Sequence, residues 1–484
     1  MCKRLPLFVT LLIVAAQARA EEPCLRLPLA AAEIPAPRVS WYGIYMNGQK
    51  VGWMREEFGK GAMGYFLDQT GRLSMTSMGQ TMELELSSRE EFDGSAPFAF
   101  RGGRSVMKQG EEARIIEVAR REGSLSAEVS EGGERRTHEV AALDYTLADL
   151  LTPERWVRTR PAAGATARVR TFDFDELKPD SDLLTIAKRR ESIVAGVREV
   201  WYEATSLSEL SGEESTVRVD AEGKLLSIKF AGLFEGRLET EEIAKRTEIS
   251  ADLFVFGLAK LDKPIGEAPA VRRLVLEVDG AAAAKIPAGP RQAIAREDGT
   301  GAITLTLGAE AAPPAAATPK EIEDALADTV ASPIRLPQVE ALAAQAVGDA
   351  QTPREKVERL VRFVDKYVDD VLSARELSVV EIIAGKRGDC SEHAALFTAL
   401  ARAAGIPARE VSGLMYMGDD ARAFGGHAWN EVVLDGRWIA VDPTWNQIDI
   451  DATHITLTRD GKGMAFLATM GRLEFRLRAV ERAK

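Results

Sequence analysis

The sequence predicts an α+β protein: an N-terminal region of mostly antiparallel strands, followed by a C-terminal domain in which helices precede strands. Short alternating patterns separated by turn residues run through residues 39–249, an Ala/Pro-rich break follows at 308–320, and helix-like periodicity resumes beyond it. This order of elements is typical of segregated α+β domains. At roughly 150 residues per domain, a chain of 484 residues has room for two or three.

The first twenty residues have the pattern of a cleavable signal peptide. Lys3 and Arg4 precede the apolar run 5–16, and Ala18-Arg19-Ala20 places small residues where signal peptidase reads them. We therefore expect cleavage after Ala20 and a periplasmic or secreted protein. The apolar run falls short of the roughly 20 residues that a membrane helix needs, and no later segment approaches that length, so no membrane span is predicted.

Residues 39–249 read as one mostly β domain. Strand-like runs are joined by hairpin signals such as Asn47-Gly48, and one helix is expected near Leu147 to Val157, where apolar residues follow helical spacing. Residues 250–307 hold another strand pair and form a small β module or a continuation of that domain. The segment 308–320 reads as a linker, and residues 321–484 as the C-terminal domain.

Charge and cysteine usage narrow the function. A formal net charge of -12 offers no electrostatic basis for binding nucleic acid. Of three cysteines, Cys2 leaves with the predicted signal peptide, so the exported chain retains only Cys24 and Cys390. Two thiols are too few for a disulfide framework. A single pairing between them stays open as an alternative to a reactive thiol at Cys390.

Cys390 opens a predicted helix. Gly388-Asp389 precedes it, Gly405 and Pro407 end the helix, and its apolar side consists of Ala394, Phe397, Leu400, Ala401 and Ala404. Unpaired backbone N–H groups and the positive end of the helix dipole stabilise a thiolate in the first turn. The same N–H groups could hold the oxyanion of a tetrahedral intermediate. Cys390 is therefore the predicted nucleophile.

Hairpin register then predicts the partners of the thiol. Asp435-Gly436 separates two strand-like runs and favours a two-residue turn. Counting outward from this turn places Asp442 opposite Trp429, with His427 one diagonal step away on the same face. Diagonal neighbours lie about 7 to 8 Å apart, within side-chain reach. The pattern thus predicts a nucleophile, a base and a carboxylate that orients the base.

Three motifs resemble those of the bacterial transglutaminase-like superfamily: Gly388-Asp389-Cys390, Gly426-His427-Ala428-Trp429 and Val441-Asp442-Pro443-Thr444-Trp445. The resemblance covers about residues 355–455. It implies a papain-like thiol fold with Cys390 as nucleophile, His427 as general base and acid, and Asp442 as orienting carboxylate. It also implies thioester chemistry on a protein or peptide amide, without a cofactor or a metal.

Several alternatives remain open on the sequence alone. The superfamily resemblance fits a transferase, a peptidase or amidase that only hydrolyses, or a non-catalytic scaffold. Cys390 could be a buried small hydrophobe, and Cys390, His393, His427 and His454 could bind zinc. Trp429, Trp438 and Trp445 could line an acyl-donor cleft, or they could belong to the core of the sheet.

Overall fold

The computed structural model describes residues 23–483, apart from 47, 78–79, 122–123, 141–142, 195–196, 211, 213, 231–233, 247–250, 253–257, 281–282, 284–285, 297–301, 372–376 and 460–472. The predicted signal peptide lies outside these residues. Among the residues that are described, no helix combines the length and the apolar character needed to cross a membrane.

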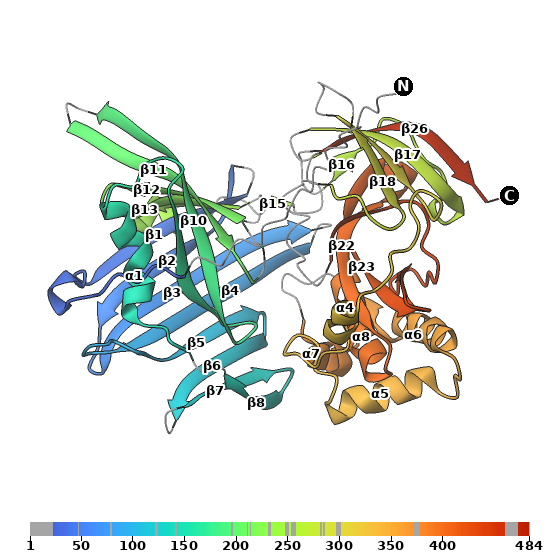
Figure 1. Ribbon diagram of the computed structural model, residues 1–484, viewed down its shortest axis with the longest axis horizontal. Helices are drawn as coiled ribbons and strands as arrows, with labels where there is room; N and C mark the ends of the chain where they lie inside the picture. The colour runs from blue at the N-terminus through green and yellow to red at the C-terminus, as the bar shows by residue number, and fades with distance from the viewer. Residues whose placement is uncertain are drawn as a thin grey trace, which may run out of the picture.

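The N-terminal part is a large, mostly antiparallel sheet with helix α1 (Leu147–Arg158) and the short helix α2 (Glu241–Ala244) against it (Figure 1). Its strand order is β8-β7-β6-β5-β4-β3-β2-β1-β14-β13-β12-β11-β10-β9, and the short β15 pairs with β3. The strands are β1 (Arg38–Met46), β2 (Gln49–Lys60), β3 (Gly64–Ser77), β4 (Gln80–Asp93), β5 (Phe100–Gln109), β6 (Glu112–Arg121), β7 (Ser124–Glu131), β8 (Glu134–Val140), β9 (Thr166–Asp173), β10 (Lys178–Val194), β11 (Val197–Ser208), β12 (Glu214–Asp220), β13 (Leu225–Phe230), β14 (Phe234–Glu239) and β15 (Ala251–Asp252).

Helix α1 (Leu147–Arg158) connects β8 to β9 and supports the core of this sheet. A capping box between Thr146 and Asp149 starts the helix. Leu147 and Leu151 pack into one apolar cluster of the sheet, whereas Trp156 packs into a second. The helix predicted near residues 147–157 is confirmed, and one amphipathic helix joins two apolar clusters of the sheet.

The C-terminal part combines a helical layer with a second sheet. The helices are α4 (Pro319–Asp324), α5 (Pro337–Val347), α6 (Pro353–Tyr367), α7 (Val379–Gly385), α8 (Cys390–Ala403) and α9 (Gly418–Ala421). The sheet order is β16-β23-β22-β25, with β24 on β23, built from β16 (Ala259–Lys260), β22 (Ala408–Tyr416), β23 (Ala423–Leu434), β24 (Arg437–Val441) and β25 (His454–Arg459). Helices α5, α6 and α8 share a core with β23 and β24. The predicted α+β fold class is confirmed.

A third sheet packs against the C-terminal sheet. Its order is β18-β19-β17-β26, formed by β17 (Val271–Asp279), β18 (Gln292–Arg296), β19 (Ile303–Leu307) and β26 (Glu474–Arg482). Strand β26 comes from the end of the chain and pairs antiparallel with β17. Leu276 of β17 and Leu414 of β22 belong to one apolar cluster. The small β module therefore shares a core with the C-terminal sheet.

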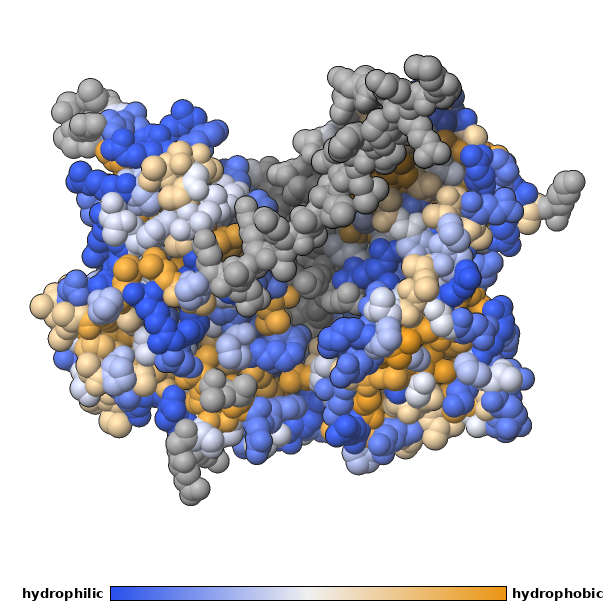
Figure 2. All heavy atoms as spheres, viewed as in Figure 1, coloured by the Kyte–Doolittle hydropathy of each residue, from blue (hydrophilic) through white to orange (hydrophobic). Residues whose placement is uncertain are grey.

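The N-terminal sheet meets the C-terminal part through the ends of its hairpins. Gln338 of α5 donates hydrogen bonds of 2.8 Å to both carboxylate oxygens of Glu134, and Arg387 pairs with Glu112. On the face shown in Figure 2, the surface is hollowed between these two parts. The contact places the β7–β8 hairpin beside the helices that lead to Cys390.

Candidate active site

The residues around Cys390 build the start of α8. Asp389 is the N-cap and accepts a 2.9 Å hydrogen bond from the backbone N–H of Ser391, while Glu392 accepts one of 2.8 Å from the N–H of Asp389. A Cβ at Gly388 would lie 2.2 Å from Cβ of Glu392, so the position has no room for a side chain. Each residue of Gly388-Asp389-Cys390 thus has a physical role, and Cys390 occupies the first helical position, half-buried.

Glu392 is a buried carboxyl group that anchors the segment before α8. Its side chain also accepts a 3.0 Å hydrogen bond from the N–H of Leu377, just before α7. Burial, together with the neighbouring charge of Asp389, raises the pKa of Glu392 to about 8. The carboxyl group therefore ties the start of α7 to the start of α8.

The hairpin that carries His427 and Asp442 has the predicted register. Asp435 and Gly436 adopt positive φ angles of 50° and 72°, and Leu434 pairs with Arg437 as β23 and β24 leave the turn. His427 Nε2 lies 2.8 Å from Asp442 Oδ2, and neither side chain is more than 4% exposed. The register brings the imidazole and the carboxylate together.

Asp442 is a saturated acceptor. Its Oδ1 receives a 2.9 Å hydrogen bond from the N–H of Thr444, and its Oδ2 lies 3.2 Å from His454 Nε2 in addition to its contact with His427. Burial would raise the pKa of Asp442, but the two histidines outweigh it and hold this pKa well below its ordinary value. Asp442 is therefore an anion at every ordinary pH.

The imidazole of His427 is held ready to carry a proton. Burial lowers its pKa, whereas the charge of Asp442, the hydrogen bond to it and an interaction with the Cys390 side chain raise the pKa to about 9. Since Nε2 faces Asp442, Nδ1 is the nitrogen left for Cys390. His427 thus contacts the Asp442 carboxylate and interacts with the side chain of Cys390.

Asn430 couples the helix of the thiol to the strand of the histidine. Its side chain is fully buried and donates hydrogen bonds of 3.0 Å to the carbonyl of Ala394 and 2.8 Å to Thr398 Oγ1. Both acceptors belong to α8 and the donor belongs to β23. The separation between Cys390 and His427 is therefore set partly by a buried amide.

The three tryptophans divide between core and surface. Trp429 and Trp438 are 1% and 2% exposed, whereas Trp445 is 55% exposed. The Trp429 ring lies 6.0 Å from the ring of His427, nearly parallel to it, and meets His454 edge-on at 5.3 Å. Trp429 thus supports both imidazoles, and the large exposed surface among the three belongs to Trp445, three residues from Asp442.

The residues suggested for zinc do not meet around one point. Among the described residues, the group that could present three ligand atoms to an ion is His427, Asp442 and His454, with these atoms within 4.8 Å of one another. His393 instead places Nδ1 2.7 Å from the carbonyl oxygen of Asp389. Both imidazoles can donate to Asp442, so hydrogen bonding accounts for this group without an ion. Cys24 and Cys390 are free, and the alternative disulfide is not formed.

His454 was not predicted as a partner of Asp442. It lies on β25, which pairs with β22 and places His454 opposite Met415. The sequence did contain a hint of this contact. Asp451 and His454 are ionisable residues close to the start of a strand, and they follow Asp442 by about ten residues. Placing them at the site requires the pairing of β25 with β22, and these two strands are not joined by a short turn from which the register could be counted.

A thiol at the start of a helix, beside a histidine and a carboxylate on a neighbouring hairpin, is the arrangement of papain-like thiol folds. Residues 340–443 match the model of the transglutaminase-like superfamily, and the chain therefore carries a transglutaminase-like domain over these residues.

Individual relatives match parts of the chain. Human kyphoscoliosis peptidase is 28% identical over 121 residues, which make up 23% of this chain and 18% of that protein. A candidate cysteine protease from Cytophaga hutchinsonii has a TM-score of 0.29 at 17% identity, covering 44% of this chain and 86% of its own. A protein with a domain of unknown function from Brucella abortus has a TM-score of 0.32 at 11% identity, covering 42% of this chain and 96% of its own. The match to the human protein spans less than a fifth of that protein.

Proposed function

We propose that this protein is an exported thiol enzyme that transfers or hydrolyses the acyl group of a protein or peptide amide through a thioester at Cys390. The observation that carries the proposal is the buried 2.8 Å contact between His427 and Asp442, with His427 also interacting with a cysteine in the first turn of α8. In this proposal Cys390 is the nucleophile, His427 the general base and acid, and Asp442 the orienting carboxylate.

The chemistry proceeds in two balanced halves. The Cys390 thiolate attacks the amide carbonyl carbon, and helix N–H groups stabilise the resulting oxyanion. The C–N bond then breaks as His427 gives its proton to the departing amine, which leaves a thioester. In the second half, His427 takes a proton from water or from an acceptor amine, which attacks the thioester and expels the thiolate. The protein then returns to its starting protonation state.

The choice of substrate class and location rests on sequence. The pattern of residues 1–20 supports export, and the peptidase named above supports a peptide amide. The exposed ring of Trp445, close to Asp442, offers an apolar surface to an extended chain. No step in the proposed chemistry needs a cofactor.

A peptide carrying an electrophilic amide mimic tests the proposal. We expect a covalent adduct on Cys390, located by mass spectrometry, that is absent in Cys390→Ala and strongly reduced in His427→Ala. Cys24 provides an internal control because it is the other free thiol of the described chain. Labelling of Cys24 and Cys390 at equal rates would instead support a non-catalytic scaffold.

The fate of the thioester separates transfer from hydrolysis. Once a peptide substrate is turned over, a primary amine should divert product into a new amide if the enzyme is a transferase. A strict peptidase or amidase would yield the free acid at the same rate with or without the amine.

A further inference from the structure

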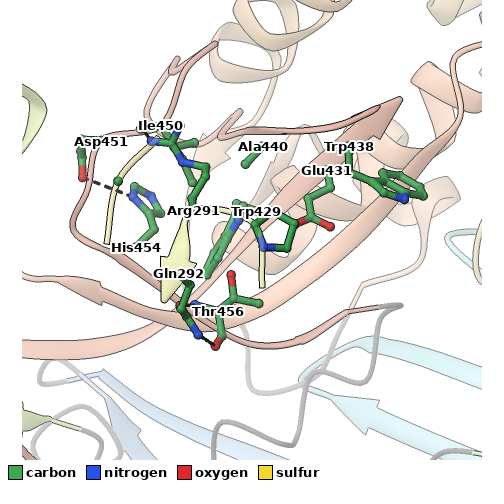
Figure 3. Close-up of a pocket in the computed structure, with 12 residues that line it drawn as sticks. Arg291, Gln292, Trp429, Glu431, Trp438, Ala440, Ile450, Asp451, His454 and Thr456 are labelled. Atoms are coloured by element: carbon green, nitrogen blue, oxygen red, sulfur yellow. Dashed lines mark hydrogen bonds and ion pairs between the residues drawn. The ribbon is translucent and has the colours of Figure 1, made fainter. Parts of the chain in front are cut away.

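His454 is buried between two carboxylates. Its side chain is fully buried, with Nε2 3.2 Å from Asp442 Oδ2 and Nδ1 3.3 Å from Asp451 Oδ1. Figure 3 shows the ring beside Asp451, at the wall of a small cavity. Nδ1 makes no hydrogen bond in the structure and meets Asp451 at ion-pair distance only. Two anionic oxygens within 3.3 Å of the ring nevertheless favour, through their charge, a ring that carries a proton on both nitrogens.

Asp451 is fixed by its own partners. Its Oδ1 accepts hydrogen bonds from the N–H and the hydroxyl of Thr453, at 2.8 and 2.6 Å, and its Oδ2 accepts one of 2.9 Å from Gln447 Nε2. Burial would raise the pKa of Asp451, but His454 and these donors hold it below its ordinary value. Asp451 is therefore a second buried anion within reach of the same imidazole.

These groups form a closed ring of contacts. Gln447, which binds Asp451 through its side chain, also exchanges two backbone hydrogen bonds of 2.8 and 2.9 Å with Asp442. The path runs from Asp442 through His454, Asp451 and Gln447 back to Asp442. Gln447 fixes the backbone of Asp442, and His454 meets its carboxylate. Together these contacts limit the rotation of the Asp442 side chain.

Other charged groups near His454 already have partners. The cavity beside the ring has a volume of about 10 Å³, room for about one water molecule, and Arg291 and Glu431 also line it. Arg291 pairs with Asp449 at 3.0 Å, and Glu431 pairs with Arg409 at 2.7 Å. Among the residues that the structure describes, His427 is the remaining titratable neighbour, with its ring centre 5.7 Å from that of His454. Asp442 and Asp451 are thus the carboxylates available to balance a charge on His454.

We propose that His454 is a positioning residue which, as an imidazolium held between Asp442 and Asp451, orients the Asp442 carboxylate toward His427. The inference rests on the proposed function, because the orientation matters only if His427 serves the thiol. Asp442 Oδ2 then has two fixed donors, and the carboxylate stays where it meets His427 Nε2.

The charge state of His454 can be observed directly. The chain contains four histidines, so the ring nitrogens can be resolved by NMR on protein with ¹⁵N-labelled histidine and assigned with single variants. We expect His454 to be doubly protonated at neutral pH and to lose its proton at a lower pH in Asp451→Asn. A neutral His454 ring in the wild type would overturn the proposal.

Two variants of His454 separate positioning from packing. His454→Gln keeps an N–H donor near the place of Nε2, whereas His454→Leu keeps only bulk. We expect alkylation of Cys390 at a pH of about 6 to slow roughly tenfold in His454→Leu and to recover largely in His454→Gln. In His454→Gln the titration midpoint of His427 should rise, since a neighbouring cation is lost while Asp451 remains.

Controls distinguish this inference from the proposed function. His138→Gln, on β8, should leave the alkylation rate unchanged. Equal rates in wild type, His454→Gln and His454→Leu, beside a slow His427→Ala, would overturn the role of His454 and leave the thiol chemistry standing. A slow wild type would overturn the proposed function itself. If His454→Leu fails to fold, the titration midpoint of His427 in His454→Gln still tests the inference. A midpoint equal to that of the wild type would overturn it.

Discussion

Replacing Asp442 with asparagine removes one charge from the site and preserves its shape. The 2.8 Å contact with His427 Nε2 can persist, because an amide oxygen also accepts a hydrogen bond, and the N–H of Thr444 keeps an acceptor only if the amide oxygen turns toward it. Both demands cannot be met by one oxygen. The imidazolium form of His427 therefore loses its counter-ion and competes for the remaining acceptor.

The size of the effect follows from the pKa of His427. Asp442, together with Cys390, raises this pKa from 6.5 to about 9 against the opposing effect of burial. At 1.36 kcal/mol for each pH unit, the rise corresponds to roughly 3 kcal/mol of stabilisation of the imidazolium form. Cys390 and the retained hydrogen bond supply part of it, so we expect the thiolate–imidazolium pair in Asp442→Asn to weaken by about 1.5 to 3 kcal/mol, or roughly tenfold to a hundredfold.

Alkylation by iodoacetamide measures this pair without a substrate. At a pH of about 6, well below the ordinary thiol pKa of about 8.5, the rate at Cys390 reports the fraction of thiolate. Mass spectrometry locates the label, and a Cys24→Ser background removes the competing thiol. We expect Asp442→Asn to react at a tenth of the wild-type rate or less, with His427→Ala as the lower limit. An unchanged rate in Asp442→Asn would refute the role given to this carboxylate.

Three further changes test the surroundings of the site and the N-terminal core. Gly388→Ala places a methyl group 2.2 Å from Cβ of Glu392, so calorimetry should show a lower melting temperature than in the matched Gly61→Ala, whose nearest neighbour would lie at 3.9 Å. Asn430→Ala removes two buried hydrogen bonds between β23 and α8, and denaturant titration should show a loss of about 2 to 4 kcal/mol. Burial raises the pKa of Glu90 from 4.5 to about 7. The folded protein therefore loses stability as the pH rises between these values, because the buried carboxyl group must then either keep its proton or become a buried charge. Glu90→Gln should therefore gain up to roughly 3 kcal/mol at pH 8 and almost nothing at pH 4, and equal gains at both pH values would contradict this cause.

The sequence could predict those elements that are determined by residues close together in the chain. A cap, a stop signal and a two-residue turn each act within a few residues, which is why the start of α8 at Cys390 and the register between β23 and β24 could be worked out. The turn at Asp435-Gly436 carries its register outward to His427 and Asp442. Their proximity could be predicted because one short turn connects them.

The elements that sequence could not predict depend on pairings across long separations. Strand β26 lies about 200 residues beyond its partner β17. Strand β1 pairs with β14, which follows it by about 200 residues, in the middle of the N-terminal sheet. Alternating patterns indicate a strand and its buried face, yet they do not select a partner among many similar strands. The contacts around His454 could not be predicted for the same reason, because they depend on the pairing of β25 with β22.

Charge balance explains why the site would include a second histidine. In the proposed resting state, Cys390, Asp442 and Asp451 carry one negative charge each, while His427 and His454 carry one positive charge each, so the net charge is -1 by this count. Acylation neutralises both the thiolate and His427, and the net charge stays at -1. With a neutral His454 it would be -2 in both states, in surroundings where an uncompensated charge is costly. A permanent cation at His454 therefore stabilises both states alike, and leaves His427 as the member of the cluster whose proton moves.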